Sequence, residues 1–251
     1  MKADFIIIGS GMAGMSAAYR LSKHGKVVVL EKESLLGYHT TGRSAAFFTE
    51  NYGNKTIRAI TKASRYFLEN PPACFKENEL MTNYGGSLFI ANKNQSALID
   101  KELEYAEALS ANVFEISIKK ALEMVPVIKK NYIDRAIHEP DSKAMDVDLI
   151  HQGFARGLKS NNGTIVFNAE VNKIEKLNQD WKVYTKTDHF SAPIIINAAG
   201  AWCDEVAVLA GCKPLGLEPK RRTVIIFENS ENINTSNWPV VIDVEDNFYF
   251  K

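Results

Sequence analysis

Apolar and polar residues near the N-terminus alternate in a way that predicts a strand, a helix and a second strand. Phe5–Ile8 is a short apolar run bounded by glycine, typical of a strand buried on both faces. Residues 12–24 follow helical spacing, with Ala13, Ala17 and Leu21 on one side, and a glycine then ends the helix. "KVVVLE" predicts a second buried strand, which completes a β-α-β unit.

The rest of the chain also alternates between helical and extended patterns. Apolar positions such as Ile57 and Ile60 have helical spacing, and Asp146 is a good N-cap for the helix that follows it. Helices are predicted at 54–69, 96–110, 121–125, 147–159 and 202–209, and strands at 87–91, 164–168, 170–177, 181–187, 194–196 and 222–227. The pattern contains no internal repeat.

A secretory signal peptide is the competing interpretation of the first 20 residues. Lys2 and the small residues 16–18 imitate its basic region and its cleavage site. Asp4 and the glycines of the following turn interrupt the apolar core that such a peptide needs. A buried strand and helix therefore explain the stretch better.

The turn between this first strand and helix, Gly9-Ser10-Gly11-Met12-Ala13-Gly14, fits the pattern GxGxxG. Its glycines would permit a tight turn, close approach to a pyrophosphate and close packing of helix on strand. Glu31 stands at the end of the second strand, where a carboxylate can accept hydrogen bonds from ribose hydroxyls and repel a 2′-phosphate. The combination predicts dinucleotide binding and disfavours NADP. A glycine-rich structural turn and a solvated glutamate are the alternatives.

A segment at 37–53, "GYHTTGRSAAFFTENYG", follows instead of another simple β-α unit. Its hydroxyl groups and guanidinium suit phosphate contacts, and its small residues would let a flat ring lie against the chain. A polar surface loop is the alternative. A second strand, small-residue turn and helix occurs at "IIINAAGAWCDEVAVLAG", where backbone could again approach a cofactor.

Composition narrows the class of protein further. The 251 residues carry 30 basic and 30 acidic side chains, so no net charge favours nucleic acid or an anionic membrane as partner. The sequence contains no run of 18 apolar residues, so it predicts no membrane span. Cys74, Cys203 and Cys212 are odd in number and lack metal-site spacing, which suits reduced thiols in the cytoplasm and predicts no metal.

The motifs together resemble the FAD-dependent D-amino-acid oxidase superfamily, which includes glycine and sarcosine oxidases. The resemblance rests on GSGMAG, Glu31, TTGRSAA and NAAGAW. "GYHTTGRSAA", "NPPACF", "DVDLIHQGFARGLK", "NAAGAWCDEVAVLAG" and "PLGLEPKRR" are more similar to its D-arginine dehydrogenase group. The resemblance implies an α/β protein with a Rossmann-like FAD-binding domain (1–53 and 143–216) and an interleaved α+β substrate domain with a mixed or antiparallel sheet (54–142 and 217–251).

It also implies noncovalent FAD and a set of contacts. The implied contacts are Gly9, Gly11, Met12, Ala13 and Gly14 at the pyrophosphate, Glu31 at the ribose with Lys32 beside it, His39, Thr40, Thr41, Gly42, Arg43, Ser44, Ala45 and Ala46 along the pyrophosphate and flavin, the backbone of Val171 at adenine, and Ala199, Gly200 and Trp202 at the cleft. Since the family continues beyond the position of Lys251, the resemblance further implies a C-terminally truncated chain.

The chemistry implied is oxidation of a D-amino acid or related amine to the imino acid by hydride transfer to flavin N5, with oxygen or a quinone as final acceptor. Candidates beside the substrate are Tyr52, Arg221 or Arg222, and Tyr249, and each has a packing or surface-charge alternative. His138 and His151 are interpreted as strand-end and helix-surface residues.

Two departures from the D-arginine dehydrogenase pattern bear on the substrate. Phe47 replaces a histidine beside the flavin, and Gly86 replaces a glutamate that holds a cationic side chain. We therefore expect a neutral or apolar amino acid rather than D-arginine. The alternatives are a 2-hydroxy-acid or polyol-phosphate oxidoreductase on the same fold, and an inactive flavin-binding fragment.

Overall fold

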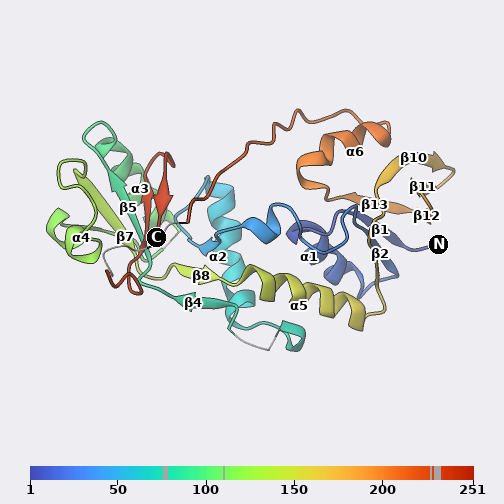
Figure 1. The fold of residues 1–251 in the computed structure, drawn as a ribbon, viewed down its shortest axis with the longest axis horizontal. Helices are drawn as coiled ribbons and strands as arrows, with labels where there is room; N and C mark the ends of the chain where they lie inside the picture. Colours follow the sequence, from blue (N-terminus) through green and yellow to red (C-terminus); the bar gives the residue numbers. More distant parts are fainter. Residues whose placement is uncertain (76–78, 110, 227, 229–232) are drawn as a thin grey trace. The chain divides into compact units, whose positions relative to one another are not determined.

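The computed structural model describes residues 1–75, 79–109, 111–226, 228 and 233–251, and the chain forms two compact units (Figure 1). The first unit comprises Met1–Ala45, Pro72–Asn78 and Val147–Ile225, and the second comprises Ala46–Pro71, Glu79–Asp146 and Ile226–Lys251. These bounds differ from those expected for the cofactor and substrate domains, whose roles stay predictions. In the described part of the chain, no helix has the length and apolar character needed to cross a membrane.

The first unit is built on a parallel sheet of four strands in the order β13-β1-β2-β9. Its strands are β1 (Phe5–Ile8), β2 (Val27–Leu30), β9 (Thr164–Val166) and β13 (Ile194–Asn197). Ile6 lies between Val28 and Ile195 in the sheet. Because neighbouring strands are parallel, their carboxyl ends meet at one edge, where ligands of open α/β sheets bind.

Side chains on successive strand positions point to opposite faces of this sheet. On one face, α1 (Met12–Leu21), α5 (Val147–Ser160) and η2 (Ala73–Phe75) pack together. Tyr19 of α1 lies with its ring centroid 5.8 Å from those of both Phe75 and Phe154. These aromatic contacts tie the first helix of the chain to one that begins more than a hundred residues later.

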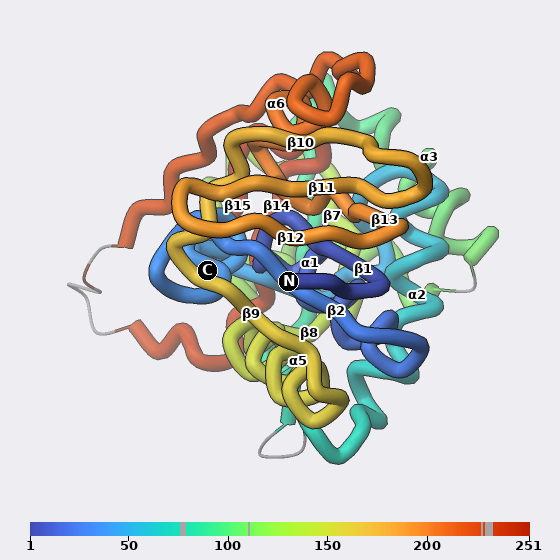
Figure 2. The backbone as a smooth tube through the Cα atoms, turned by 90° about the vertical axis from the view of Figure 1, so that its right-hand side faces the viewer, coloured from blue at the N-terminus to red at the C-terminus, as the bar shows by residue number. Residues whose placement is uncertain are grey.

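A three-stranded antiparallel sheet covers the other face. It consists of β10 (Val171–Leu177), β11 (Asp180–Thr185) and β12 (His189–Ala192), which run side by side in Figure 2. Ile174, Val183 and Phe190 from this sheet share a core with Ile6 and Val28. The unit is completed by η1 (Thr41–Arg43), η3 (Gly200–Trp202) and α6 (Cys203–Leu209).

The second unit has a mixed sheet in the order β15-β14-β5-β7-β6 and a small antiparallel sheet in the order β3-β8-β4. The larger sheet contains β5 (Ser87–Ala91), β6 (Phe114–Ile116), β7 (Arg135–Glu139), β14 (Val240–Asp243) and β15 (Tyr249–Phe250), and the smaller contains β3 (Phe47–Phe48), β4 (Met81–Asn83) and β8 (Lys143–Met145). The unit also contains α2 (Lys55–Glu69), α3 (Ser96–Ala108) and α4 (Ile118–Met124).

Strand β5 shows how this larger sheet is buried on both faces. Leu88 and Ile90 lie in a core with Ala121 of α4, whereas Phe89 and Ala91 lie in a second core with Ile99 of α3. The five residues of β5 are all buried. Together the two units confirm the predicted combination of a parallel α/β sheet with mixed and antiparallel sheets.

Two predicted helices are present but bury other residues than those whose spacing indicated them, and one predicted strand is wrong. The buried residues of α1 are Gly14, Met15, Ala18 and Tyr19, whereas Ala13 is exposed, because the small alanines allow more than one face to look apolar. Ile57 and Ile60 of α2 are exposed. The strand expected at 222–227 is absent over 222–226, which are exposed and unpaired, and residue 227 lies outside the described residues.

Candidate functional site

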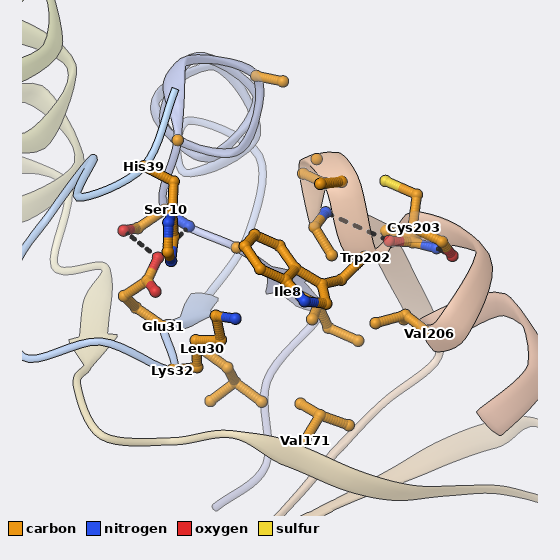
Figure 3. A pocket seen from close by; sticks show the side chains of 18 of the residues that line it. Ile8, Ser10, Leu30, Glu31, Lys32, His39, Val171, Trp202, Cys203 and Val206 are labelled. Carbon is orange, nitrogen blue, oxygen red and sulfur yellow. Dashed lines mark hydrogen bonds between the residues drawn. The ribbon is translucent and has the colours of Figure 1, made fainter. Parts of the chain in front are cut away.

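A cavity of about 520 Å³ opens at the carboxyl ends of β1, β2 and β13 (Figure 3). Its wall is formed by the last residues of these strands, the start of α1, the segment 37–41, residues 169–171 and the beginning of α6. All of these belong to the first unit. The cavity lies where a doubly wound sheet positions a dinucleotide.

Most of the residues predicted to contact a cofactor line this single cavity. They are Gly9, Gly11, Met12, Ala13, Glu31, Lys32, His39, Thr40, Thr41, Val171, Ala199, Gly200 and Trp202. Segments far apart in the sequence therefore come together at the expected edge of the sheet.

The glycines of the first turn have different surroundings. Gly9 has φ +103°, and a Cβ built on it would lie 2.4 Å from the carbonyl oxygen of Ala198. A Cβ on Gly14 would lie 2.0 Å from the carbonyl oxygen of Gly9. A Cβ on Gly11 would meet only Thr41 Oγ1, at 3.4 Å. Close backbone packing thus requires glycine at 9 and 14, whereas at 11 the backbone is bare on a side open to the cavity.

Some of the amides around this turn have internal partners, and others have none among the described residues. Ser10 N donates to Glu31 Oε2 at 2.9 Å, and Met12 N donates to Thr41 Oγ1 at 3.0 Å. Within the described residues, no partner is found for the N–H groups of Gly11, Ala13 and Gly14. Free amides at the start of a helix are the groups that hold phosphates. This arrangement fits the pyrophosphate of a dinucleotide.

Glu31 is held firmly at the end of β2. Its side chain accepts from Ser10 Oγ at 2.5 Å through Oε2, and from Glu33 N at 2.9 Å through Oε1. The residue is 7% exposed. Since Ser10 N also bonds to Oε2, the carboxylate has its lone pairs on that oxygen engaged and retains an acceptor position on Oε1.

An aromatic side chain, Trp202, lines the cavity. The Trp202 ring lies with its centroid 4.7 Å from that of His39 and 3.3 Å from Lys32 Nζ, and Figure 3 shows the three side chains together at the cavity. His39 Nε2 in turn contacts Glu33 Oε1 at 2.8 Å. The imidazole, tilted at 53° to the indole, and the cation over the indole face position Trp202 at the cavity wall.

Other predicted cofactor residues do not line the cavity. They are Gly14, Gly42, Arg43, Ser44 and Ala45 in the first unit, and Ala46 in the second. Arg43 lies over the ring of Tyr38 at 5.0 Å. Contacts of these residues with FAD stay predictions.

The four candidates beside the substrate do not gather at this cavity either. Tyr52 and Tyr249 belong to the second unit, and both are partly exposed. Arg221 and Arg222 lie in an exposed segment of the first unit that forms no helix or strand. Their roles also stay predictions.

Sequence reasoning missed two buried residues behind the glycine-rich turn. Ser10, an unspecified position of the GxGxxG pattern, is fully buried and bonds to Glu31. His151 is 2% exposed, so its interpretation as a helix-surface residue is wrong. It lies on the buried face of α5, where Ile150 and Phe154 gave the only sequence signal.

A buried carboxylate organises the segment before Tyr52 in the second unit. Glu139 is 1% exposed and accepts hydrogen bonds from Glu50 N at 2.7 Å and Asn51 N at 3.3 Å. Burial raises the pKa of Glu139 to about 7, although the two backbone N–H groups favour its charged form. The neighbouring Arg65–Glu50 ion pair, at 2.8 Å, completes this cluster.

These features define a dinucleotide-binding α/β protein: a parallel sheet, a glycine-rich turn, free amides at the start of a helix and a glutamate at the end of a strand. The model of the DAO family, the FAD dependent oxidoreductases, matches residues 4–251, and the chain belongs to this family. FAD is therefore its cofactor, as the sequence predicted.

Curated relatives and solved structures agree with this family. The chain is 27% identical over 233 residues to glycerol 3-phosphate dehydrogenase of Caloramator mitchellensis, covering 90% of this chain and 48% of that protein. It is 25% identical over 261 residues to mitochondrial dimethylglycine dehydrogenase of Homo sapiens, covering 100% of this chain and 29% of that one. The chain thus spans about half the length of the first relative and less of the second.

Similarity to solved structures concerns the fold. Glycine oxidase from Geobacillus kaustophilus matches with a TM-score of 0.75 and 17% identity over 84% of this chain and 58% of that chain. L-proline dehydrogenase from P. horikoshii matches with a TM-score of 0.79 and 19% identity over 97% of this chain and 65% of that chain.

Proposed function

We propose that the protein oxidises a D-amino acid or a related amine to the imino acid, with FAD held by the first unit. The observation that supports this most is the convergence of the glycine-rich turn, Glu31 and the turn before α6 on one cavity. When bound, FAD supplies the acceptor for a hydride. The protein's own residues bind it and orient it.

In this proposal the free amides of Gly11 and Ala13 hold the pyrophosphate, and Glu31 Oε1 accepts from a ribose hydroxyl. Lys32, His39 and Trp202 border the same space. The segment from Gly42 to Ala46 continues toward the flavin. Tyr52, Arg221 or Arg222, and Tyr249 contribute to the substrate pocket.

An amine donor is supported by the names of several similar proteins. Dimethylglycine dehydrogenase, glycine oxidase and L-proline dehydrogenase are all named for amino acids. The D configuration of the substrate and a relationship to the D-arginine dehydrogenase group rest on the sequence motifs alone. The cytoplasmic location expected from the cysteines is likewise a proposal.

The local structure around Gly86 supports a neutral or apolar substrate. Gly86 has φ +84°, and a Cβ there would lie 2.3 Å from the carbonyl oxygen of Glu139 and 2.8 Å from Pro140 Cα. Backbone therefore fills the space that a glutamate side chain would need. Phe47, the other departure, lies with its ring centroid 5.2 Å from that of Tyr84.

Replacing Gly86 by glutamate is expected to destabilise the protein without creating activity toward D-arginine. Positive φ and the clash with Glu139 together should cost about 3 kcal/mol or more of unfolding free energy. Thermal melting and a D-arginine turnover assay check this. The Phe47→His variant is assayed beside it, because Phe47 is the other position that departs from the D-arginine dehydrogenase pattern. A well-folded Gly86→Glu protein that oxidises D-arginine would contradict our choice of substrate.

Absorption spectroscopy tests the proposed function directly. The purified protein should show flavin bands in the visible range, and anaerobic addition of D-alanine, D-proline or sarcosine should bleach them. Bands that no amine bleaches would leave a flavin-binding protein without amine oxidation. Absence of flavin uptake would overturn the proposal.

A second candidate is oxidation of a 2-hydroxy acid or a polyol phosphate. It is favoured by the similarity to a glycerol 3-phosphate dehydrogenase. Anaerobic glycerol 3-phosphate and 2-hydroxyglutarate distinguish it, because bleaching by these compounds and not by amines would select this alternative.

A further inference from the structure

One buried imidazole lies directly behind the glycine-rich turn and has no part in the proposed chemistry. His151 of α5 does not line the cavity, yet its Nε2 lies 2.7 Å from the carbonyl oxygen of Ser10. A carbonyl oxygen can only accept, so Nε2 carries the proton and donates it. The histidine thus satisfies a buried backbone carbonyl.

This hydrogen bond has a consequence for the next residue in the chain. The peptide between Ser10 and Gly11 is planar and trans, because the described part of the chain contains no cis peptide bond. Its N–H therefore points opposite to its C=O. Since the Ser10 carbonyl points at His151, the Gly11 N–H points away from α5. Gly11 lines the cavity, and its N–H has no partner among the described residues.

The same imidazole also lies against the second loop of the cavity wall. A Cβ built on Gly37 would lie 3.0 Å from His151 Cε1 and 3.2 Å from its Nδ1. Gly37 has φ +64°, and its carbonyl oxygen accepts from Gly42 N at 2.7 Å. The ring thus fills the space behind this loop, as it does behind the glycine-rich turn.

The two loops are also joined in front of the ring. Met12 N donates to Thr41 Oγ1 at 3.0 Å, which connects the start of α1 to the short helix η1. The two loops are therefore connected both by the Met12–Thr41 hydrogen bond and through their common contact with His151. Of these two contacts, the one from His151 fixes the direction of a peptide whose N–H has no partner among the described residues.

We propose that His151 is a positioning residue for FAD binding: it orients the Ser10–Gly11 peptide so that the Gly11 N–H is directed at the cofactor's pyrophosphate, and it supports the loop at Gly37. This inference rests on FAD binding at the cavity. It assigns to His151 no contact with the cofactor or the substrate.

Variants of His151 in the 251-residue chain test the proposal by cofactor affinity. Apoprotein is titrated with FAD, ADP and adenosine, with flavin fluorescence or competition as readout. His151→Leu should weaken FAD and ADP binding at least tenfold and adenosine binding less than twofold, because only the first two ligands carry a pyrophosphate. His151→Phe keeps a ring against Gly37 and replaces the leucine variant if that protein does not fold.

His151→Gln retains an N–H donor of similar reach and should bind FAD within threefold of the wild type. A matched control is His138→Leu, since His138 Nε2 lies 2.9 Å from the Gly85 carbonyl oxygen in the second unit. This control should leave FAD affinity unchanged. Melting of each apoprotein measures any general loss of stability.

Three results would overturn the proposal. The first is an FAD affinity of the leucine and phenylalanine variants within twofold of the wild type. The second is an equal loss of affinity for ADP and for adenosine. The third is a glutamine variant that binds FAD as weakly as the leucine variant. A wild-type protein that takes up no FAD would instead refute the binding site itself, and that result is distinguishable because it precedes any variant.

Discussion

At the scale of single residues, Glu31 combines a structural and a binding role. Its carboxylate accepts three hydrogen bonds from its own chain, from Ser10 N, Ser10 Oγ and Glu33 N. A carboxylate offers about four acceptor positions, so one remains for a ligand hydroxyl. The three internal bonds fix the orientation of that last position before a ligand arrives, which lowers the entropy lost on binding.

Glu31→Gln should therefore weaken FAD binding by about tenfold or more. An amide replaces one acceptor oxygen with a donor that faces other donors, and hydrogen bonds to a charged group are worth about 1.5–3 kcal/mol. Titration of apoprotein with FAD measures the loss. Glu175→Gln is the control, because Glu175 belongs to the first unit but does not line the cavity. Equal affinities for the Glu31 variant and the wild type would refute the role.

At the scale of elements, the turn from β1 to α1 gives each glycine a separate test. Gly14→Ala should unfold or strongly destabilise the first unit, because its Cβ would overlap the Gly9 carbonyl oxygen. Gly11→Ala should fold with nearly normal stability, because only Thr41 Oγ1 approaches. It should nevertheless bind FAD more weakly, since the methyl group enters the cavity. Melting curves and FAD titrations separate the two effects, and equal stability of the two variants would contradict the assignment.

Glu139 of β7, which binds the backbone before Tyr52, should make the stability of the protein depend on pH. The pKa of Glu139 is raised to about 7 in the folded protein, above the usual value of an unfolded glutamate. The protonated carboxyl group of Glu139 contributes fully to the free energy of unfolding below about pH 4.5. This contribution, about 3 kcal/mol at most, is lost as the pH rises through 7. Denaturant unfolding between pH 5 and 8 should show this fall. Glu139→Gln should flatten the curve, and an unchanged slope would contradict burial of this carboxyl group as the cause.

The sequence predicted some of these elements well for identifiable physical reasons. Strands β1 and β2 are uninterrupted apolar runs beside glycines, so their burial on both faces is readable from composition. Glu31 was recognisable because it is a carboxylate and also stands at the expected spacing after the glycine-rich turn, at the end of the second strand. His151 was not, because helical periodicity places it beside a buried face without saying what covers that face.

Pairing between distant segments could not be read from the sequence in the same way. The sequence of β5 predicted a strand, but not that β14 would lie parallel to it. The candidates Tyr52, Arg221, Arg222 and Tyr249 came from resemblance alone, and nothing local marks them. At residues 222–226 the prediction itself was wrong, because an apolar run favours a strand but does not show whether another strand is available to pair with it.

At the scale of the whole molecule, FAD should raise the melting temperature of the protein. A ligand at one hundred times its dissociation constant adds about 2.7 kcal/mol of stability, or about 5–10 °C for 150–250 residues. FMN is the control, because it lacks the adenosine half that Glu31 is proposed to bind. Calorimetry measures both shifts, and an equal effect of FMN would contradict binding at this cavity.

The order of strands in the parallel sheet also bears on how the protein is made. Strand β1 has β2 as one neighbour within the first 30 residues, but its other neighbour, β13, is Ile194–Asn197. At synthesis rates of about 5–20 residues per second, β1 emerges roughly 10–40 s before β13 is made, and its edge is open during that time. Since exposed strand edges promote aggregation, the nascent chain carries this risk until β13 has been synthesised.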